Sequence, residues 1–389
     1  MSTASQLPRG LSKLPAIKHY FRSLKDPRRR HRRLHRLLDM IVVAICAVLC
    51  GADDWQEVVT FGQGRLAWLK RFLALPNGIP SHDTFERVFA RLDPQAFQAC
   101  FRTWTAALCA RLEMPHIAID GKTLRHSGAG SLGPLHVVSA WATANHLALG
   151  QEAIEEKSNE LRAIPRLLEL LAREGALVTF DALGCQKDIA SQVVAQGGDY
   201  VLAVKDNQPT LHADIQQVFD DLLSEQETAL EHRALETHER DHGRTESRCY
   251  HVVSLPADFA ERHAAWEGLR SLGLVLSARQ VGQQEPTYEA RFFISSLKPG
   301  VRRFAQAVRQ HWGIENSLHW HMDITFGEDG SRIRQRRGAE NFALLRRLAV
   351  GLLKRHPAKK SIACKRLAAA LDTGFLEEIL QGAGNSEKG

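Results

Sequence analysis

Two stretches decide the fold prediction for this 389-residue chain: HIAID at residues 116–120 and LVTFD at residues 177–181. Each is a short apolar run of β character that ends in a carboxylate, Asp120 or Asp181. Three more runs, 135–141, 147–153 and 200–204, have the same β character, and helical patterns at 160–173 and 189–195 lie between the later runs. This order predicts an α/β fold in which helices and strands form layers.

The chain before this region is predicted to be helical. Apolar residues recur at helical spacing from Leu34 to Leu49, and the pattern repeats over 55–75. Ser81 is a candidate N-cap for another helix. We therefore predict an N-terminal all-helical domain over 1–112.

The regions after residue 112 are separated by changes in composition. The segment 207–290 is polar, with a charged helix predicted at 210–232 and strands at 248–254 and 272–280, and we interpret it as an insertion. A long helix is predicted at 301–320, followed by a basic helical region and one last helix. The predicted regions are the first part of the core at 113–206, the insertion at 207–290, the second part of the core at 291–355, and a basic C-terminal helix and tail at 356–389.

Composition limits the functional classes. The net charge of +7 favours a polyanionic partner, and 44% hydrophobic residues argue against disorder over most of the chain. The seven cysteines include no CxxC pair, which is typical of a reduced cytosolic protein and unlike a disulfide scaffold or a zinc finger. The longest apolar run, 41–52, is too short to span a bilayer, and the N-terminus does not resemble a signal peptide.

A third acid with chemical potential is Glu315, in the stretch RQHWGIENSLHW at 309–320. His311 and His319 are four residues to either side, which predicts that all three share one face of a helix. The aromatic and apolar neighbours predict a largely buried segment. Two aspartates on strands and a glutamate on a later helix can hold two hard cations through oxygen atoms, and two metal ions suit phosphodiester chemistry. For each aspartate alone, capping of the next turn is the alternative role.

The ordered motifs resemble those of DDE-type insertion-sequence transposases, in particular the H-repeat-associated branch. The matching stretches are GIPSHDTF (78–85), IAIDGKTLR (117–125), TFDALGCQ (179–186), DYVLAVKDNQ (199–208), HGRTESR (242–248), FISSL (293–297) and HWGIENSLHW (311–320). The resemblance covers nearly the whole chain. It implies an RNase-H-like mixed-sheet catalytic core with an inserted, partly β segment, and a triad at Asp120, Asp181 and Glu315 that also binds the metal.

The resemblance also implies an activity and partners. The expected reaction is metal-dependent cleavage at the ends of a transposable element followed by strand transfer. The expected cofactor is Mg²⁺, with Mn²⁺ as a substitute. The expected partner is double-stranded DNA, both terminal repeats and target, bound by a homodimer in the bacterial cytoplasm at the nucleoid and not at a membrane. One departure is that the family's Tyr, Arg and Lys near the glutamate correspond here to Val308, His311 and Met322.

Basic residues near these motifs are candidate DNA contacts, with an ordinary solvated charge as the alternative for each. The densest run is RRRHRRLHR at 28–36, and further clusters are at 332–337 and 359–366. The candidates are Arg28, Arg29, Arg30, Arg32, Arg33, Arg36, Lys122, Arg125, Lys205, Arg244, His311, His319, Arg332 and Arg334.

Other functions compete with transposition. A metal-dependent nuclease that does not join DNA would use the same three acids. A noncatalytic DNA-binding relic would tend to lose one of them, and all three are present. A zinc hydrolase using His319, His321 and Asp323 is disfavoured, because His-x-His on a helix directs the two rings to different faces.

Overall fold

The computed structural model describes residues 19–108, 116–128, 133–154, 160–171, 175–224, 230–241 and 243–381. It has a mixed α/β fold, as predicted, in which nine strands are hydrogen-bonded in the order β3-β2-β1-β4-β5-β9-β8-β7-β6. The chain forms two compact units. Unit 1 comprises Met1–Leu112, Gly121–Glu160 and Glu315–Gly389, and unit 2 comprises Glu113–Asp120 and Leu161–Ile314.

Unit 1 is mainly helical, as the sequence predicts for its N-terminal part. Its elements are α2 (Leu37–Leu49), α3 (Trp55–Gly64), α4 (Leu66–Leu69), α5 (His82–Phe89), α6 (Pro94–Leu108), β2 (Leu135–Ala142), β3 (Leu147–Ile154), α12 (Arg336–Arg355), α13 (Ile362–Leu371) and α14 (Thr373–Leu380). The C-terminal segment holds two helices where one was predicted. Asp372 separates the two helices because its backbone is extended, with φ −123° and ψ 113°. Its side chain accepts a hydrogen bond from the Gly374 amide and so caps the start of α14.

Helix α12 is the centre of unit 1. It packs against α2, α5, α6, β2 and β3, and nearly its whole length is buried. Trp55 packs against Phe89 and Phe342, with ring centroids 4.6 and 4.8 Å apart. The side-chain amide of Asn341, which is fully buried, donates to the carbonyls of Phe89 and Leu92. Aromatic packing and this amide therefore fix α12 against the N-terminal helices.

Unit 2 contains most of the sheet. Its strands are the first part of β1 (His116–Leu124), β4 (Leu177–Phe180), β5 (Asp199–Val204), β6 (His232–Asp241), β7 (Arg244–Ser254), β8 (Ser271–Val281) and β9 (Thr287–Ser295). Strands β1, β4 and β5 are parallel, and β9, β8, β7 and β6 follow in antiparallel order. Helices α8 (Lys187–Ala195), α9 (Pro209–Leu223), α10 (Ala257–Arg262) and α11 (Val301–His311) belong to this unit, as does most of α7 (Glu160–Leu171).

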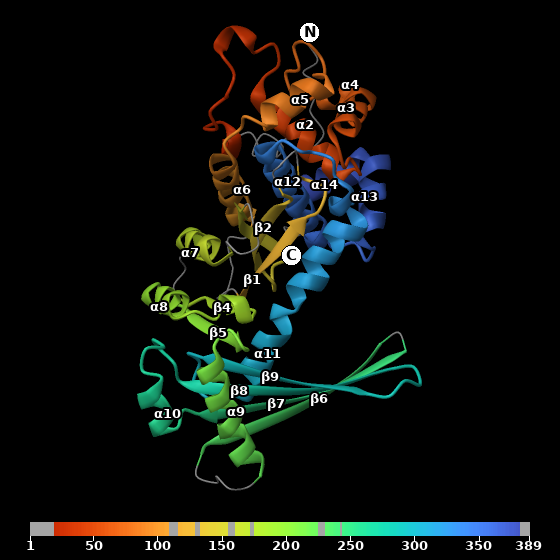
Figure 1. Cartoon of the computed structure of the whole chain (residues 1–389). Helices are drawn as coiled ribbons and strands as arrows, with labels where there is room; N and C mark the ends of the chain where they lie inside the picture. Colours follow the sequence, from red (N-terminus) through yellow and green to blue (C-terminus); the bar gives the residue numbers. More distant parts are fainter. Residues whose placement is uncertain are drawn as a thin grey trace, which may run out of the picture. The chain divides into compact units, whose positions relative to one another are not determined.

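The segment 207–290, interpreted from the sequence as an insertion, extends the sheet of unit 2, and Figure 1 shows its long strands lying beside β9. Strand β6 was not predicted, because its sequence HRALETHERD has almost no apolar residues. It is the edge strand of the sheet, where charged residues are common. Backbone hydrogen bonds to β7 hold β6 in the sheet, and its side chains show no apolar pattern that would predict a strand.

Helices cover both faces of this sheet. Successive residues of β9 point to opposite faces, so Phe293 packs on Phe304 of α11 while Phe292 packs on Phe219 of α9. The α11 side also buries Val201 of β5 and Tyr250 of β7. The apolar runs of the core strands thus correspond to burial on both sides. Among the described helices of both units, none is long and apolar enough to cross a membrane.

Candidate active site

Asp120 and Asp181 lie side by side in unit 2. Strands β1 and β4 are parallel, and Ile119 is the register partner of Phe180. Each aspartate is the next residue along its strand, and neighbouring strands are about 4.8 Å apart. Because the side chains of paired residues point to the same face, this register predicts that the two carboxylates lie close together. Asp120 is half-buried and Asp181 is exposed.

The two aspartates differ in their local structure. The sequence places both at strand ends, but β1 continues to Leu124, so Asp120 lies within its strand. Asp181 follows the last residue of β4 and caps the 3₁₀ turn Ala182–Gly184, where its Oδ1 accepts a hydrogen bond from the Leu183 amide at 3.1 Å. A Cβ at Gly184 would clash with the Phe180 ring, which explains the glycine in this motif. Capping thus engages Oδ1 of Asp181.

A glycine follows Asp120 for a steric reason. A Cβ at Gly121 would overlap the side chains of Glu160 and His136, which form an ion pair in unit 1. His136 and Glu160 are both almost fully buried. The Thr123 hydroxyl lies 2.8 Å from Nδ1, the other ring nitrogen of His136. The Asp-Gly sequence therefore lets the strand pass close to this buried pair.

A buried hydrogen-bond relay lies beside the aspartates in unit 2. The Thr179 hydroxyl lies 3.1 Å from His116 Nε2 and 3.0 Å from His311 Nδ1. Since one hydroxyl donates one hydrogen and can also accept, one imidazole accepts and the other donates. Burial lowers the pKa of His116 to about 3, with a further contribution from His311. Burial also lowers the pKa of His311 to about 4, although the Asp120 charge opposes this.

Both imidazoles are therefore uncharged at neutral pH. Any contact between His311 and a phosphate would be a neutral hydrogen bond and not an ion pair. Sequence reasoning singled out His311 but did not recognise Thr179 or His116. Thr179 carried a signal, since it lies two residues before Asp181 in an otherwise apolar strand.

Glu315 starts a change in helical form. Instead of one helix over 301–320, α11 ends at His311, and two π-helical segments follow at Glu315–His319 and His321–Thr325. Glu315 and His319 begin and end the first π-helical segment, and their shared face stays a prediction. Ile314 and Leu318 are buried as predicted, but Glu315 and Trp320 are exposed. Glu315 directly follows Ile314, the last residue of unit 2.

The donor set of unit 2 fits a hard divalent cation in part. Asp120 and Asp181 supply carboxylate oxygens, the ligands that Mg²⁺ prefers. Within the described residues, no three His, Cys, Asp or Glu side chains are grouped to hold a metal ion. Glu315 as the third ligand therefore remains a prediction from the sequence.

Lys122 is buried among carboxylates and does not face solvent, as a phosphate contact would require. Its Nζ lies 2.5 Å from Asp323, 3.1 Å from Asp329 and 4.0 Å from Glu328 in unit 1. Only 9% of the Lys122 side chain is exposed, whereas Arg125, which is 3.3 Å from Asp329, is 76% exposed. Arg125 thus remains accessible to a ligand, and Lys122 joins its strand to the acidic segment after the π-helices.

That acidic segment also contains a buried acid. Glu328 is fully buried and forms an ion pair with Arg347 of α12 at 3.1 Å. Arg347 also donates to the Ser139 hydroxyl in β2 and to the Ala343 carbonyl. Burial of a charged pair requires such partners for the remaining polar atoms. Glu328 is therefore a structural residue of unit 1.

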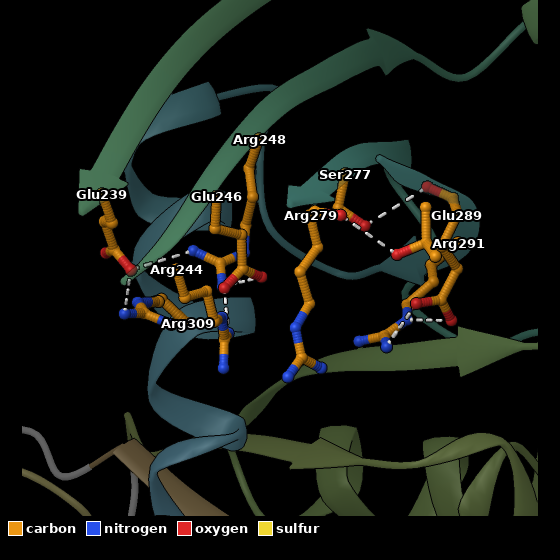
Figure 2. A network of polar contacts seen from close by, with 10 residues as sticks. Glu239, Arg244, Glu246, Arg248, Ser277, Arg279, Glu289, Arg291 and Arg309 are labelled. Atoms are coloured by element: carbon orange, nitrogen blue, oxygen red, sulfur yellow. Dashed lines mark hydrogen bonds and ion pairs between the residues drawn. The ribbon is translucent and has the colours of Figure 1, made fainter. Parts of the chain in front are cut away.

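Arg244 and Arg248 lie on β7 and are engaged by acids. Figure 2 shows them with Arg309 around Glu239 and Glu246. Burial raises the pKa of Glu246, but the hydrogen bonds and charges of Arg244 and Arg248 outweigh burial and leave the pKa below its usual value. This network joins β6 and β7 to helix α11, so the charge of Arg244 is largely balanced within the protein.

Other predicted DNA contacts differ in exposure. Lys205, Arg332 and Arg334 are exposed, and His319 is half-buried. In the N-terminal run, Arg29, Arg30, Arg32, Arg33 and Arg36 are exposed, whereas the Arg28 side chain is only 9% exposed. In the C-terminal cluster, Lys365 and Arg366 are buried. They donate to backbone carbonyls, including those of Leu353 and Val48, so for these two residues the prediction of a solvent-facing DNA contact is wrong.

Comparison with known proteins identifies the family. Residues 111–352 match the family described as "Transposase DDE domain", and residues 18–105 match "DDE_Tnp_1-associated". The chain is 38% identical over 379 residues to "H repeat-associated putative transposase YhhI" of Escherichia coli (strain K12), covering 96% of this chain and all of that protein. It is also 38% identical to "Putative transposase YncI" of Escherichia coli O157:H7, covering 94% and 95% of the two chains.

Among solved structures, a piggyBac transposase synaptic complex with hairpin DNA aligns with 98% of this chain and 80% of that chain. The TM-score is 0.37 at 12% sequence identity, which is too low to carry a functional argument. The family match covers more than half of the chain and includes both aspartates and Glu315. Together with the full-length relatives, it shows that this chain belongs to the DDE-domain transposase family, in the H-repeat-associated group.

Proposed function

We propose that this protein cuts DNA at the ends of its transposable element and joins the freed ends to target DNA. The observation that carries the proposal is the placement of Asp120 and Asp181 directly after the paired residues Ile119 and Phe180 of two parallel strands. Such a pair of carboxylates on neighbouring strands suits divalent cations of the Mg²⁺ type, with Mn²⁺ as a substitute.

In this proposal Asp120, Asp181 and Glu315 hold the cations. When bound, two divalent ions would stabilise the attacking and leaving oxygens of the phosphodiester. In the cleavage step, water attacks phosphorus, the bond to the 3′ oxygen breaks, and a 3′-hydroxyl and a 5′-phosphate result. In the joining step, that 3′-hydroxyl attacks a target phosphodiester and displaces the target's own 3′ oxygen. One phosphodiester replaces another, so no external energy source is required.

The remaining residues act by positioning. The Thr179 relay holds His311 in place, and burial keeps its imidazole neutral by lowering its pKa. The side-chain amide of Asn207 donates to the Ala182 carbonyl at 2.7 Å, which fixes the turn after Asp181. The exposed cations Arg125, Lys205, Arg332 and Arg334 contact the DNA backbone, and His319 and Arg244 are weaker contributors. Two DNA ends must be brought together, so the active form on DNA is proposed to be a homodimer.

The test uses duplex DNA that carries the inverted repeats flanking the gene. Wild type is expected to cleave and join it only with Mg²⁺ or Mn²⁺ present. Asp120→Asn, Asp181→Asn and Glu315→Gln are each expected to abolish both steps while DNA binding persists. Asp206→Asn is a matched control in unit 2, because that carboxylate is 99% exposed. Glu285→Gln, also exposed, is the control for Glu315.

The outcomes separate the alternatives. Cleavage without joining of pre-cleaved ends would indicate a nuclease. Binding without cleavage would indicate a noncatalytic DNA-binding protein. Full activity of Glu315→Gln with loss in the two aspartate variants would mean that a different residue completes the site.

A further inference from the structure

A basic pocket lies within unit 1. Its residues come from a part of the sequence that precedes Asp120, Asp181 and Glu315. Its volume is about 410 Å³, and it lies between residues 27–35 and the α5 region of residues 84–91. Arg29 and Arg32 come from the first segment, and Arg87 and Arg91 come from the second. All four residues are exposed. The pocket therefore draws arginines from two separate parts of the chain.

Some arginines of the run 28–36 donate hydrogen bonds within the protein, and others are exposed and can bind a ligand. Arg28 makes a bidentate contact with Asp26, at 3.0 and 2.8 Å, and donates to the His35 carbonyl at 2.6 Å. Arg33 donates to the Arg28 carbonyl at 3.0 and 2.8 Å. These bonds shape the segment that forms one wall of the pocket. Their guanidinium groups are therefore engaged within the protein.

The four pocket arginines have a different status. Within the described part of the chain, none of them has a carboxylate within 4.0 Å, and Arg87 donates only to the Asp83 backbone carbonyl. Four like charges around one pocket repel one another, and an anion would relieve that repulsion. His35 also lines the pocket, and its buried Nδ1 has no hydrogen-bond partner in the described structure. Burial lowers the pKa of His35 and favours its neutral form.

We propose that this pocket binds phosphate groups of the DNA backbone through Arg29, Arg32, Arg87 and Arg91. Guanidinium groups suit phosphate because they donate paired hydrogen bonds in one plane. The inference rests on the proposed function, since DNA is the partner of that function, and it assigns a specific contact site to the helical domain. Backbone contacts carry no sequence information, so this site adds affinity and register for any duplex.

The experiment measures fluorescence anisotropy of the full chain with a labelled terminal-repeat duplex and a scrambled duplex of equal length, over a range of salt concentrations. The pocket variant is Arg87→Gln with Arg91→Gln. The control, Lys70→Gln with Arg71→Gln, removes the same charge from exposed residues of unit 1 outside the pocket. A second pocket variant, Arg29→Gln with Arg32→Gln, alters the other wall, so loss of fold in one variant leaves the other to decide.

Each pocket pair is expected to lower the slope of log affinity against log salt by about two, and affinity on the order of tenfold, for both duplexes. The control pair is expected to change both quantities far less. Equal losses in pocket and control pairs would overturn the pocket assignment. Displacement of the duplex by a mononucleotide at micromolar concentration would overturn it too, in favour of a free nucleotide.

This design separates the two proposals. If wild type binds DNA through the pocket but does not cleave with Mg²⁺, the catalytic proposal fails and the pocket stands. If cleavage occurs and pocket variants bind as the control does, the pocket fails and the catalytic proposal stands. If wild type binds no DNA, both fail.

Discussion

The Thr179 hydroxyl in β4 lies 3.0 Å from Nδ1 of His311 and ties that strand to the end of α11. Asp181 follows Thr179 by two residues, and Glu315 follows His311 by four. One hydroxyl therefore connects the segment that carries the second aspartate with the segment that leads to the glutamate. The same hydroxyl also bonds His116 at 3.1 Å, so its loss affects two buried rings.

Removing this hydroxyl is expected to destabilise the protein. Thr179→Val keeps the shape but leaves two buried imidazole nitrogens without their partner, at a cost of about 1–3 kcal/mol. Urea unfolding measures the loss. Thr179→Ser retains the hydroxyl and is expected to keep most of the stability. A loss in Thr179→Ser with none in Thr179→Val would assign the effect to the methyl group and not to the relay.

Breaking the buried ion pair in unit 1 is expected to have a larger effect. Arg347→Met leaves the Glu328 carboxylate buried with Lys122 as a more distant partner at 4.0 Å, so a loss of about 3–5 kcal/mol is expected. Adding Glu328→Gln removes the stranded charge and is expected to restore part of the stability. A double-mutant cycle from urea unfolding measures the coupling, and strict additivity would contradict the pairing.

Glu340 is expected to make stability depend on pH. Burial, followed by the charge of Glu152, raises its pKa to about 7, so between about pH 4.5 and 7 the folded protein keeps a proton that the unfolded chain releases. The stabilisation that comes from this proton is fully present below about pH 4.5 and is lost as pH rises through 7. Glu340→Gln is therefore expected to raise stability by about 1–2 kcal/mol at pH 8 and to change it little at pH 5.

Thermal or urea unfolding at the two pH values tests this expectation. Glu261→Gln, at an exposed position, is the control, and its effect on stability relative to wild type is expected to be small at both pH values. A gain of equal size at both pH values in Glu340→Gln would mean that the glutamate does not titrate in this range.

Lys122 and Arg125 are expected to separate structure from DNA binding. Lys122→Met removes the cation of Asp323 and leaves Asp329 with Arg125 alone, so it is expected to lower stability by about 1–3 kcal/mol, with the salt slope of DNA binding unchanged. Arg125→Gln is expected to lower that slope by about one, with little change in stability. Unfolding and anisotropy titrations of both variants measure this, and a reversed pattern would make Lys122 the DNA contact.

The core strands could be predicted because each one is a short run of mainly apolar residues. The runs at 116–120, 177–181 and 200–204 are continuous and apolar, since helices cover both faces of a parallel sheet. Helix α7 was equally clear from its spacing of apolar residues. Strand β6 was not, because an edge strand is held by backbone hydrogen bonds to β7, which leave no apolar pattern.

Charged residues show the limit of sequence reasoning most clearly. Lys122, Glu328, Lys365 and Arg366 are ordinary surface charges by pattern, yet the fold buries each one, with partners that lie from 9 to 318 residues away in the chain. A charge can be buried only where opposite charges or carbonyl groups meet it. Most of these contacts join residues that lie tens or hundreds of positions apart, and no local sequence pattern records them.

The sequence by itself determined the order of the elements, the apolar strands with their aspartates, and membership in the transposase family. These follow from local patterns and from the order of motifs along the chain. Only the tertiary structure decided that Asp120 and Asp181 stand side by side, that Thr179 joins two buried histidines, and that Arg28 and Arg33 support a pocket lined by other arginines. Register between strands and the partners of charged groups arise from long-range packing, so they become defined only when the chain has folded.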